Sequence, residues 1–182
     1  MKFLICLVFL FLISNGFTAK RDANSLIQKY CKQSSKNLET YFYEFCIAAL
    51  KENHESQKVR NNKEITELGT KNAIANLTKV KSIVEKIVNE RKYKSRLSAK
   101  LLQDCLKLYY RGYNDLTSGL KYIKVRDSLN FSFSLANAKI APRMCEMGFN
   151  GDNKQISPVK KENDVLYDMI NIPYNFDLNR FT

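Results

Sequence analysis

Apolar side chains recur every three or four residues along most of this chain, and the alternation typical of strands is nearly absent. Spacings of three and four place side chains on one face of an α-helix. The pattern therefore predicts an all-α protein, and the length fits one domain with a substantial core.

Two short segments near the N-terminus predict a helical hairpin over about residues 22–52. The first segment carries Leu26 and Ile27. The second surrounds Cys46 with Tyr41, Phe42, Phe45, Ile47, Ala49 and Leu50. A polar stretch over 51–63 follows and separates the hairpin from the rest of the chain.

Four longer apolar stripes follow over about residues 62–180. The first consists of Ile65, Leu68, Leu77, Val80, Val84 and Ile87. The second consists of Leu102, Cys105, Leu106, Tyr109, Tyr113, Leu116 and Leu120. The third consists of Leu129, Phe133, Ala136, Ile140 and Met144, and the fourth of Leu166, Met169, Ile172 and Phe176. Four amphipathic helices with short connections predict an up-down four-helix bundle whose stripes face a common core.

Helix limits are suggested by a few residues. Gly148 and the polar run after it should end the third bundle helix, and Ser157 should cap the fourth, with Pro158 at its first position. Pro142 and Pro173 fall inside the third and fourth helices, where a proline costs about 3 kcal/mol. Each helix is therefore expected to kink or end there, with a loosely docked tail after Pro173.

The chain opens with the features of a secretory leader. A lysine precedes eleven apolar residues over 3–13, and small residues follow up to Ala19. Eleven residues are too few to cross a bilayer, which takes about 20 in a helix. We therefore expect a signal peptide over 1–19, a single domain over 20–182 and no membrane segment after the leader is removed.

Four cysteines remain after the leader, at Cys31, Cys46, Cys105 and Cys145. An even set behind a secretory leader indicates two disulfides. Their spacing favours Cys31 with Cys46 and Cys105 with Cys145, although three pairings are possible. No two of them have the close spacing of a zinc site, so no metal is expected.

Removing the leader leaves 29 basic and 18 acidic residues, a net charge near +11. Such a charge favours acidic partners, either a protein surface or an acidic polysaccharide, and in a secreted protein a nucleic-acid partner is not expected. The alternative is that the charge only forms a solvated basic face.

The sequence offers no catalytic constellation. The one histidine, His54, lies in the polar stretch, and neither a phosphate-binding glycine loop nor a nucleophile motif is present. Asp164 and Asp168 are more simply a polar helix face than an acid–base pair. We expect no enzyme activity and no cofactor.

Four ordered segments carry a resemblance to a known family: LIQKYCKQ over 26–33, LQDCLKLY over 102–109, MCEMGF over 144–149 and SPVKKEN over 157–163. Together they resemble the plant invertase and pectin methylesterase inhibitors. The resemblance implies a hairpin on a four-helix bundle, disulfides Cys31–Cys46 and Cys105–Cys145, secretion to the apoplast, and reversible one-to-one inhibition of a carbohydrate-active enzyme.

Two departures from the family pattern matter. The spacing between Cys31 and Cys46 is longer than usual, which predicts a longer hairpin. The Pro-Lys-Phe motif of invertase inhibitors is absent, because the corresponding region reads KVRDSLNF over 124–131. The resemblance therefore favours pectin methylesterase over invertase as the target.

This region also contains the candidate target-binding residues, namely Arg126, Asp127, Ser128, Asn130 and Phe131. A cation and an aromatic ring at a helix start can enter a sugar-binding cleft with little loss of rotamer freedom. The ordinary alternative is that Asp127 or Ser128 only caps the next helix. A second candidate surface is Lys107, Tyr110 and Arg111, which a solvated face explains equally well.

Two glycosylation sequons begin at Asn76 and Asn130. A glycan at Asn130 would obstruct docking of the neighbouring loop. The sequence thus predicts a secreted, apoplastic inhibitor of pectin methylesterase that covers the cleft of its target. An invertase inhibitor and a non-inhibitory pectin-binding module are the alternatives.

Overall fold

The computed structural model describes residues 23–36, 38–151 and 154–176. The predicted signal peptide over 1–19 and the last six residues lie outside this part, so the leader and the domain limits stay predictions. Every regular element in the described residues is helical, which confirms the all-α class. None of these helices is both long enough and apolar enough to cross a membrane.

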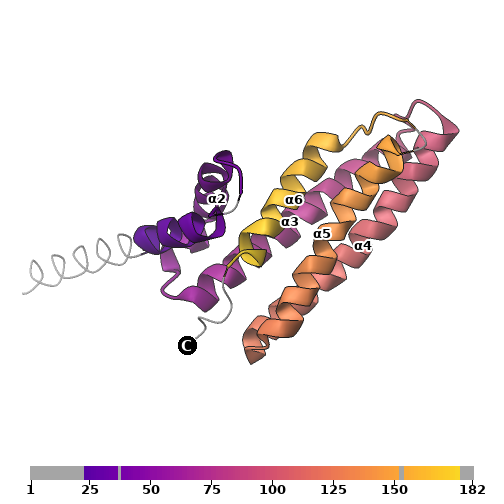
Figure 1. Cartoon of the computed structure of the whole chain (residues 1–182). Helices are drawn as coiled ribbons and strands as arrows, with labels where there is room; N and C mark the ends of the chain where they lie inside the picture. The colour runs from indigo at the N-terminus through magenta and orange to yellow at the C-terminus, as the bar shows by residue number, and fades with distance from the viewer. Residues whose placement is uncertain (1–22, 37, 152–153, 177–182) are drawn as a thin grey trace, which may run out of the picture.

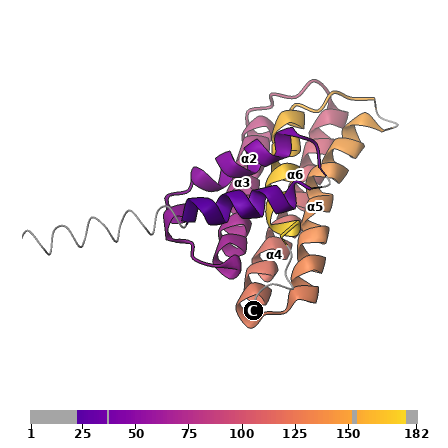
Figure 2. The same ribbon diagram turned by 60° about the vertical axis from the view of Figure 1, so that its left-hand side comes forward.

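Four long helices form the bundle: α3 (Asn62–Asn89), α4 (Arg96–Val125), α5 (Ser128–Asn150) and α6 (Lys160–Tyr174). They lie side by side along most of their lengths (Figures 1 and 2). The connections between them are short, so consecutive helices run in opposite directions. The predicted up-down bundle is therefore confirmed.

The helices α4 and α5 approach each other closely. A Cβ added at Gly112 would lie 3.1 Å from the Cβ of Ala141 and 3.2 Å from a methyl carbon of Leu77, so the absence of a side chain allows this approach. Cys105, two turns from Gly112 on α4, and Cys145, one turn from Ala141 on α5, form a disulfide with an S–S distance of 2.04 Å. Both the glycine and the disulfide hold α4 against α5.

The bundle core is built from the inner faces of all four helices. Its fully buried members include Leu77, Val84, Leu102, Tyr109, Leu116, Phe131, Leu135, Phe149, Leu166 and Ile170. The first, second and fourth predicted stripes contribute to this core or to its partly buried margin, with two kinds of exception. Tyr113 remains exposed, and four residues pack in the hairpin core instead: Ile65, Leu68, Ile172 and Phe176. The third predicted stripe does not contribute, as described below.

The N-terminal hairpin consists of a helix over 23–34 and of α2 (Tyr41–Lys51). The predicted disulfide Cys31–Cys46 joins the two and is fully buried. The hairpin lies against one end of the bundle (Figure 2). Its core includes Ile65 and Leu68 of α3, Ile172 of α6 and the neighbouring Phe176.

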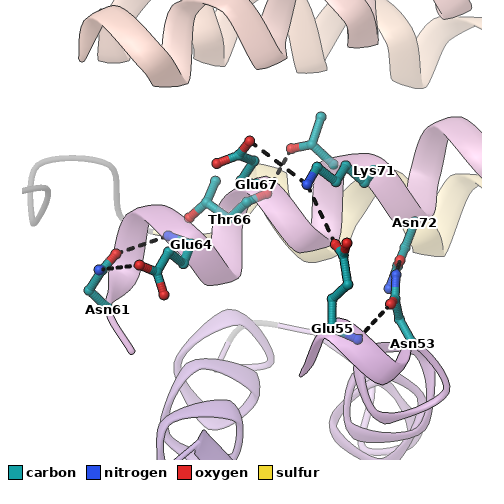
Figure 3. A network of polar contacts seen from close by, with 9 residues as sticks. Asn53, Glu55, Asn61, Glu64, Thr66, Glu67, Lys71 and Asn72 are labelled. Carbon is teal, nitrogen blue, oxygen red and sulfur yellow. Dashed lines mark hydrogen bonds and ion pairs between the residues drawn. The ribbon is translucent and has the colours of Figure 1, made fainter. Parts of the chain in front are cut away.

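The polar stretch after α2 contains the short 3-10 helix η1 (His54–Lys58), which links the hairpin to α3 (Figure 3). The side chain of Asn53 accepts a hydrogen bond from the Glu55 backbone N–H (3.0 Å) and donates to Asn72 Oδ1 (2.7 Å). Asn72 in turn donates to the backbone carbonyl of Ala49 (3.0 Å), and Lys71 forms an ion pair with Glu55 (3.5 Å). These contacts fasten the end of α2 to the middle of α3.

The predicted limits of α5 and α6 hold only in part. The helix α5 ends at Asn150, where the predicted polar run begins, but it continues past Gly148 and does not end at Pro142. Pro142 is buried, and the Cys145 disulfide follows within one turn, so tertiary contacts hold α5 against α4 despite the missing hydrogen bond. Ser157 does not cap α6, which begins only at Lys160.

Pro173 lies in the last turn of α6, which ends one residue later, as the sequence predicts. The residues that follow directly are not loose, because Phe176 is buried and its ring lies 5.4 Å from that of Tyr30.

Candidate functional site

The turn between α4 and α5 holds the residues predicted to bind a target. Arg126 ends α4 in the left-handed conformation (φ 60°), and its side chain is exposed. Asp127 caps α5: its carboxylate accepts hydrogen bonds from the Asn130 backbone N–H (3.0 Å) and from Asn130 Nδ2 (2.6 Å). These hydrogen bonds hold the pKa of Asp127 below its ordinary value. Asp127 therefore caps α5, which was the alternative to a target-binding role for this residue.

Phe131 is fully buried in the bundle core, beside Gly119 of α4. The expectation that its ring enters a target cleft is therefore corrected, because exposing it would empty a core position. Of the five predicted residues, Arg126 and Asn130 are exposed, and Asp127 and Ser128 are partly buried. The turn presents a cation and polar groups but no aromatic ring of its own.

A row of apolar side chains runs along the outer face of α5. We call it the outer stripe, and its exposed fractions are 65% for Leu129, 60% for Phe133, 50% for Ile140, 44% for Met144 and 63% for Met147. The spacings of four, seven, four and three residues keep them on one face over roughly 27 Å of helix. A continuous exposed apolar row of this kind marks an interaction surface more often than chance.

Helical periodicity predicts that most of this stripe faces the core, and that prediction is wrong. The buried face of α5 instead carries Phe131, Leu135, Ala138, Ala141, Cys145 and Phe149. Both faces have helical spacing, so periodicity alone does not distinguish them. Cys145 does distinguish them, because it must face Cys105, and counting back from it by four, seven and fourteen residues gives Ala141, Ala138 and Phe131.

Two cations lie at the edge of α5 that faces α6. The Nζ of Lys139 lies 4.0 Å from the centre of the Tyr174 ring, and the guanidinium of Arg143 lies 4.5 Å from that of Tyr167. Burial, and then the neighbouring positive charge of Arg143, lower the pKa of Lys139. Stacking on the rings restricts both side chains, so the positive charge beside the outer stripe is fixed in place.

A groove of about 400 Å³ follows this edge and is lined by Pro142, Arg143, Met147, Tyr167 and Asp164, whose carboxylate pairs with Lys160 (2.7 Å), together with Glu146 and Asn163. Glu146 and Asn163 belong to a polar network beneath the groove. Glu146 Oε1 accepts hydrogen bonds from Ser157 Oγ (2.6 Å) and from Asn163 Nδ2 (2.7 Å). The hydroxyl of Tyr109 donates to Asn163 Oδ1 (2.7 Å).

This network joins α4, α5, α6 and the connection before α6. Burial raises the pKa of Tyr109, so its hydroxyl keeps its proton at physiological pH. The protonated Tyr109 hydroxyl, through Asn163, and the disulfide at Cys145 both hold the buried side of α5 in place. Ser157, predicted as a cap, donates here to Glu146 and accepts a hydrogen bond from the Val159 backbone N–H (3.3 Å) just before α6.

The sequons and the second candidate surface occupy different environments. Asn76 lies within α3 and is partly buried, whereas Asn130 is exposed next to Leu129 at the start of the outer stripe. Glycosylation at either residue stays a prediction. Lys107, Tyr110 and Arg111 are exposed on α4, and Lys107 forms an ion pair with Asp104 (2.8 Å).

Comparisons with known proteins agree on one family. Residues 25–174 match the family described as plant invertase/pectin methylesterase inhibitor. A relative from Arabidopsis thaliana, pectinesterase inhibitor 12, is 33% identical over 176 residues, which cover 97% of this chain and 98% of the relative.

Two solved structures share the fold. A mutant form of a pectin methylesterase inhibitor from Arabidopsis has a TM-score of 0.64 at 14% identity and covers 80% of this chain and 91% of its own. A second structure of a pectin methylesterase inhibitor from Arabidopsis thaliana has a TM-score of 0.59 at 14% identity, with coverages of 87% and 97%. Such low identity shows the fold alone. The match over residues 25–174 and the 33% identical relative, however, show that this chain belongs to the plant invertase/pectin methylesterase inhibitor family, whose members are inhibitors and not enzymes.

Proposed function

We propose that this protein is a secreted inhibitor of pectin methylesterase, and that the outer stripe of α5, with the adjoining Arg126, is the surface that covers the cleft of the target. The observation that carries the proposal is the exposure of the outer stripe on a chain whose 33% identical relative is a pectinesterase inhibitor by name. One inhibitor would bind one enzyme, reversibly and without covalent chemistry.

Rigidity supports this assignment. The outer stripe lies on a helix that a disulfide and a buried hydrogen-bond network hold in place from behind. A surface already ordered in the free protein loses little conformational entropy on binding. Apolar anchors on such a surface are where most of the binding free energy of an interface resides.

Charge supports it as well. Arg126, Lys139 and Arg143 lie on or beside the face that carries the stripe, and the only acidic residue within α5 is Glu146, which is hydrogen-bonded beneath the groove. A basic rim would steer the inhibitor to a cleft lined with carboxylates and would make association depend on salt. We propose that this is how the protein recognises its target.

Invertase remains the alternative target. Inhibition of invertase would require the turn before α5 to supply a cation and a ring, and Phe131 is buried there. The turn therefore offers Arg126 alone, which supports pectin methylesterase as the target. Titrating the mature, disulfide-intact protein against both enzymes tests the choice: inhibition of invertase alone would reject it.

The surface itself is tested by a pair of matched variants. Phe133→Ser with Ile140→Ser removes two exposed anchors from the outer stripe, and we expect about tenfold weaker inhibition of pectin methylesterase, or more. Tyr110→Ser with Tyr113→Ser removes comparable exposed area from α4 and should change the inhibition constant less than about twofold. Loss of inhibition in the α4 variant alone would move the interface to the second candidate surface.

Charge is tested separately. Arg126→Glu should weaken inhibition at low salt, and the difference from the native protein should shrink as the salt concentration rises. Inhibition that responds neither to salt nor to Arg126→Glu would contradict the electrostatic part of the proposal.

A further inference from the structure

A basic pocket, separate from the outer stripe, lies at the end of the bundle where two connections meet. The α3–α4 connection over 90–95 and the α5–α6 connection reach the same end of the molecule (Figure 1). Ser98 Oγ donates a hydrogen bond to Gln155 Oε1 (3.2 Å) across the junction. Between the connections lies a pocket of about 340 Å³, lined chiefly by Lys92, Tyr93, Lys94, Lys154, Ile156 and Pro158.

Positive charge dominates the rim of this pocket. Three exposed lysines line it, Lys92, Lys94 and Lys154, and Arg91 and Arg96, which are near them in the sequence, are exposed as well. The acidic residue nearest in sequence within the described part of the chain is Glu90, which pairs with Lys92 (2.6 Å) and, more weakly, with Lys86 (4.0 Å). Among the described residues, no carboxylate lies within ion-pair distance of Lys94 or Lys154, the other two lysines that line the pocket.

Two of these cations have an unusual backbone. Arg91 and Lys154 have φ angles of 54° and 45°, in the left-handed region that favours glycine. A residue with a side chain costs roughly 1–2 kcal/mol more than glycine there. Glycine would satisfy both turns better, so each turn carries a long basic side chain at the cost of some backbone strain.

The walls of the pocket are apolar. Tyr93 packs partly against the bundle core, which fixes its ring, and Pro158 and the exposed Ile156 provide aliphatic surface. Cations around apolar walls suit a ligand that combines carboxylates with the flat C–H face of a sugar ring. An inorganic anion would use only the cations and would leave the walls without a partner.

We propose that this pocket binds the carboxylated form of an acidic polysaccharide, a chain of uronic acid residues such as de-esterified pectin. The choice of uronate rests on the proposed function, because a pectin methylesterase converts methyl esters of this polymer into carboxylates. The site uses the end of the bundle and none of the outer-stripe residues. It would hold the inhibitor on the product of its target enzyme.

Calorimetric titration of the mature protein with a de-esterified oligogalacturonate tests the site. We expect saturable binding, and at least tenfold weaker binding of the fully methyl-esterified oligomer of equal length, because esterification removes the charges that the lysines and arginines recognise. Equal binding of both oligomers, or no binding of the acidic one, would overturn the proposal.

A matched pair of variants separates the pocket from the net charge. Lys94→Gln with Lys154→Gln should weaken binding of the acidic oligomer about tenfold, since two charged contacts are lost. Lys29→Gln with Lys32→Gln makes the same change of charge at exposed positions on the hairpin and should alter binding less than about twofold. Equal weakening in both variants would mean that only the overall charge attracts the oligomer, which contradicts a built site.

Inhibition assays on the same proteins distinguish the two proposals. The Lys94→Gln, Lys154→Gln variant should inhibit pectin methylesterase as the native protein does, because neither lysine belongs to the outer stripe. If the native protein binds the acidic oligomer but inhibits no esterase, the pocket stands and the proposed function fails. If it inhibits the esterase and binds no oligomer, the pocket fails alone.

Discussion

The bundle and the hairpin are both fastened by a disulfide and built around a buried core, yet only the bundle completes its core from its own helices. The bundle core draws on the inner faces of α3, α4, α5 and α6. The hairpin core also requires Ile65 and Leu68 of α3, Ile172 of α6, and Phe176, which follows α6. The hairpin core is therefore complete only when the hairpin packs on α3 and α6.

Helix length adds to the difference. The helix α2 has 11 residues, whereas α3 and α4 have 28 and 30. Isolated helices shorter than about 12–15 residues are marginal in water, so the hairpin depends on tertiary contacts and on its disulfide. We therefore expect the hairpin to open locally before the bundle unfolds.

The largest effects should come from removing the disulfides. Replacing Cys105 and Cys145 by serine should lower the free energy of unfolding by about 4 kcal/mol, and replacing Cys31 and Cys46 by about 3 kcal/mol, because the first pair closes the longer loop. Denaturant titration measures both values. Hydrogen exchange should show faster exchange throughout the molecule for the first variant and faster exchange confined to the hairpin for the second. Equal loss of protection in the bundle with either variant would break the comparison.

The next effect tests whether a residue of α3 belongs energetically to the hairpin. Leu68→Ala should cost about 3 kcal/mol, within the usual range for a buried leucine, and should speed hydrogen exchange in the hairpin. Leu135→Ala on α5 should cost a similar amount but speed exchange in α4 and α5. If Leu68→Ala leaves the hairpin amides as protected as before, the hairpin core does not depend on α3.

A smaller effect concerns the contact between Tyr41 of α2 and Asp168 of α6. The Tyr41 hydroxyl donates to Asp168 Oδ2 (2.9 Å), and this hydrogen bond, with burial, raises the pKa of Tyr41 to about 12. Burial raises the pKa of Asp168; the hydrogen bond from Tyr41 lowers it in part, and the negative charges of Asp164 and Glu39 raise it further. Asp168 therefore holds a proton more tightly in the folded than in the unfolded protein.

A group with a raised folded pKa stabilises the fold at low pH and loses that contribution as pH rises through the folded pKa. The native protein should thus gain free energy of unfolding relative to Asp168→Asn as the pH falls from about 7 to about 4. Asparagine keeps the oxygen that accepts from Tyr41, so the variant isolates the charge. Denaturant titration over that range measures the gain, and a difference that does not vary with pH would contradict it.

The smallest effect should come from the ion pair between Glu55 of η1 and Lys71 of α3 (Figure 3). Both side chains are about half exposed, and such pairs contribute about 0.2–1 kcal/mol. Glu55→Gln should therefore lower the free energy of unfolding by no more than about 1 kcal/mol, and less at high salt. A larger, salt-independent loss would show that the hairpin depends on this pair more than on its apolar core.

The candidate site was predicted only in part. The turn at Arg126 was located from sequence, and the capping function of Asp127 had been recognised as an alternative. The burial of Phe131 and the exposure of the outer stripe were not predicted, because α5 carries apolar residues at helical spacing on two faces. The basic pocket was not foreseen either, since its cations lie in connections that are far apart in the sequence.

Local patterns in the chain are enough to predict the helices and their order, and the family resemblance implies the local pairing of the cysteines. Helical periodicity and short connections depend on residues close in the chain, so these features can be read locally. Three features follow only from the folded arrangement: which apolar face of α5 is buried, the continuation of α5 through Pro142, and the meeting of two distant connections in one basic pocket. Each of these depends on packing against helices remote in sequence, where burial and close approach override local preference.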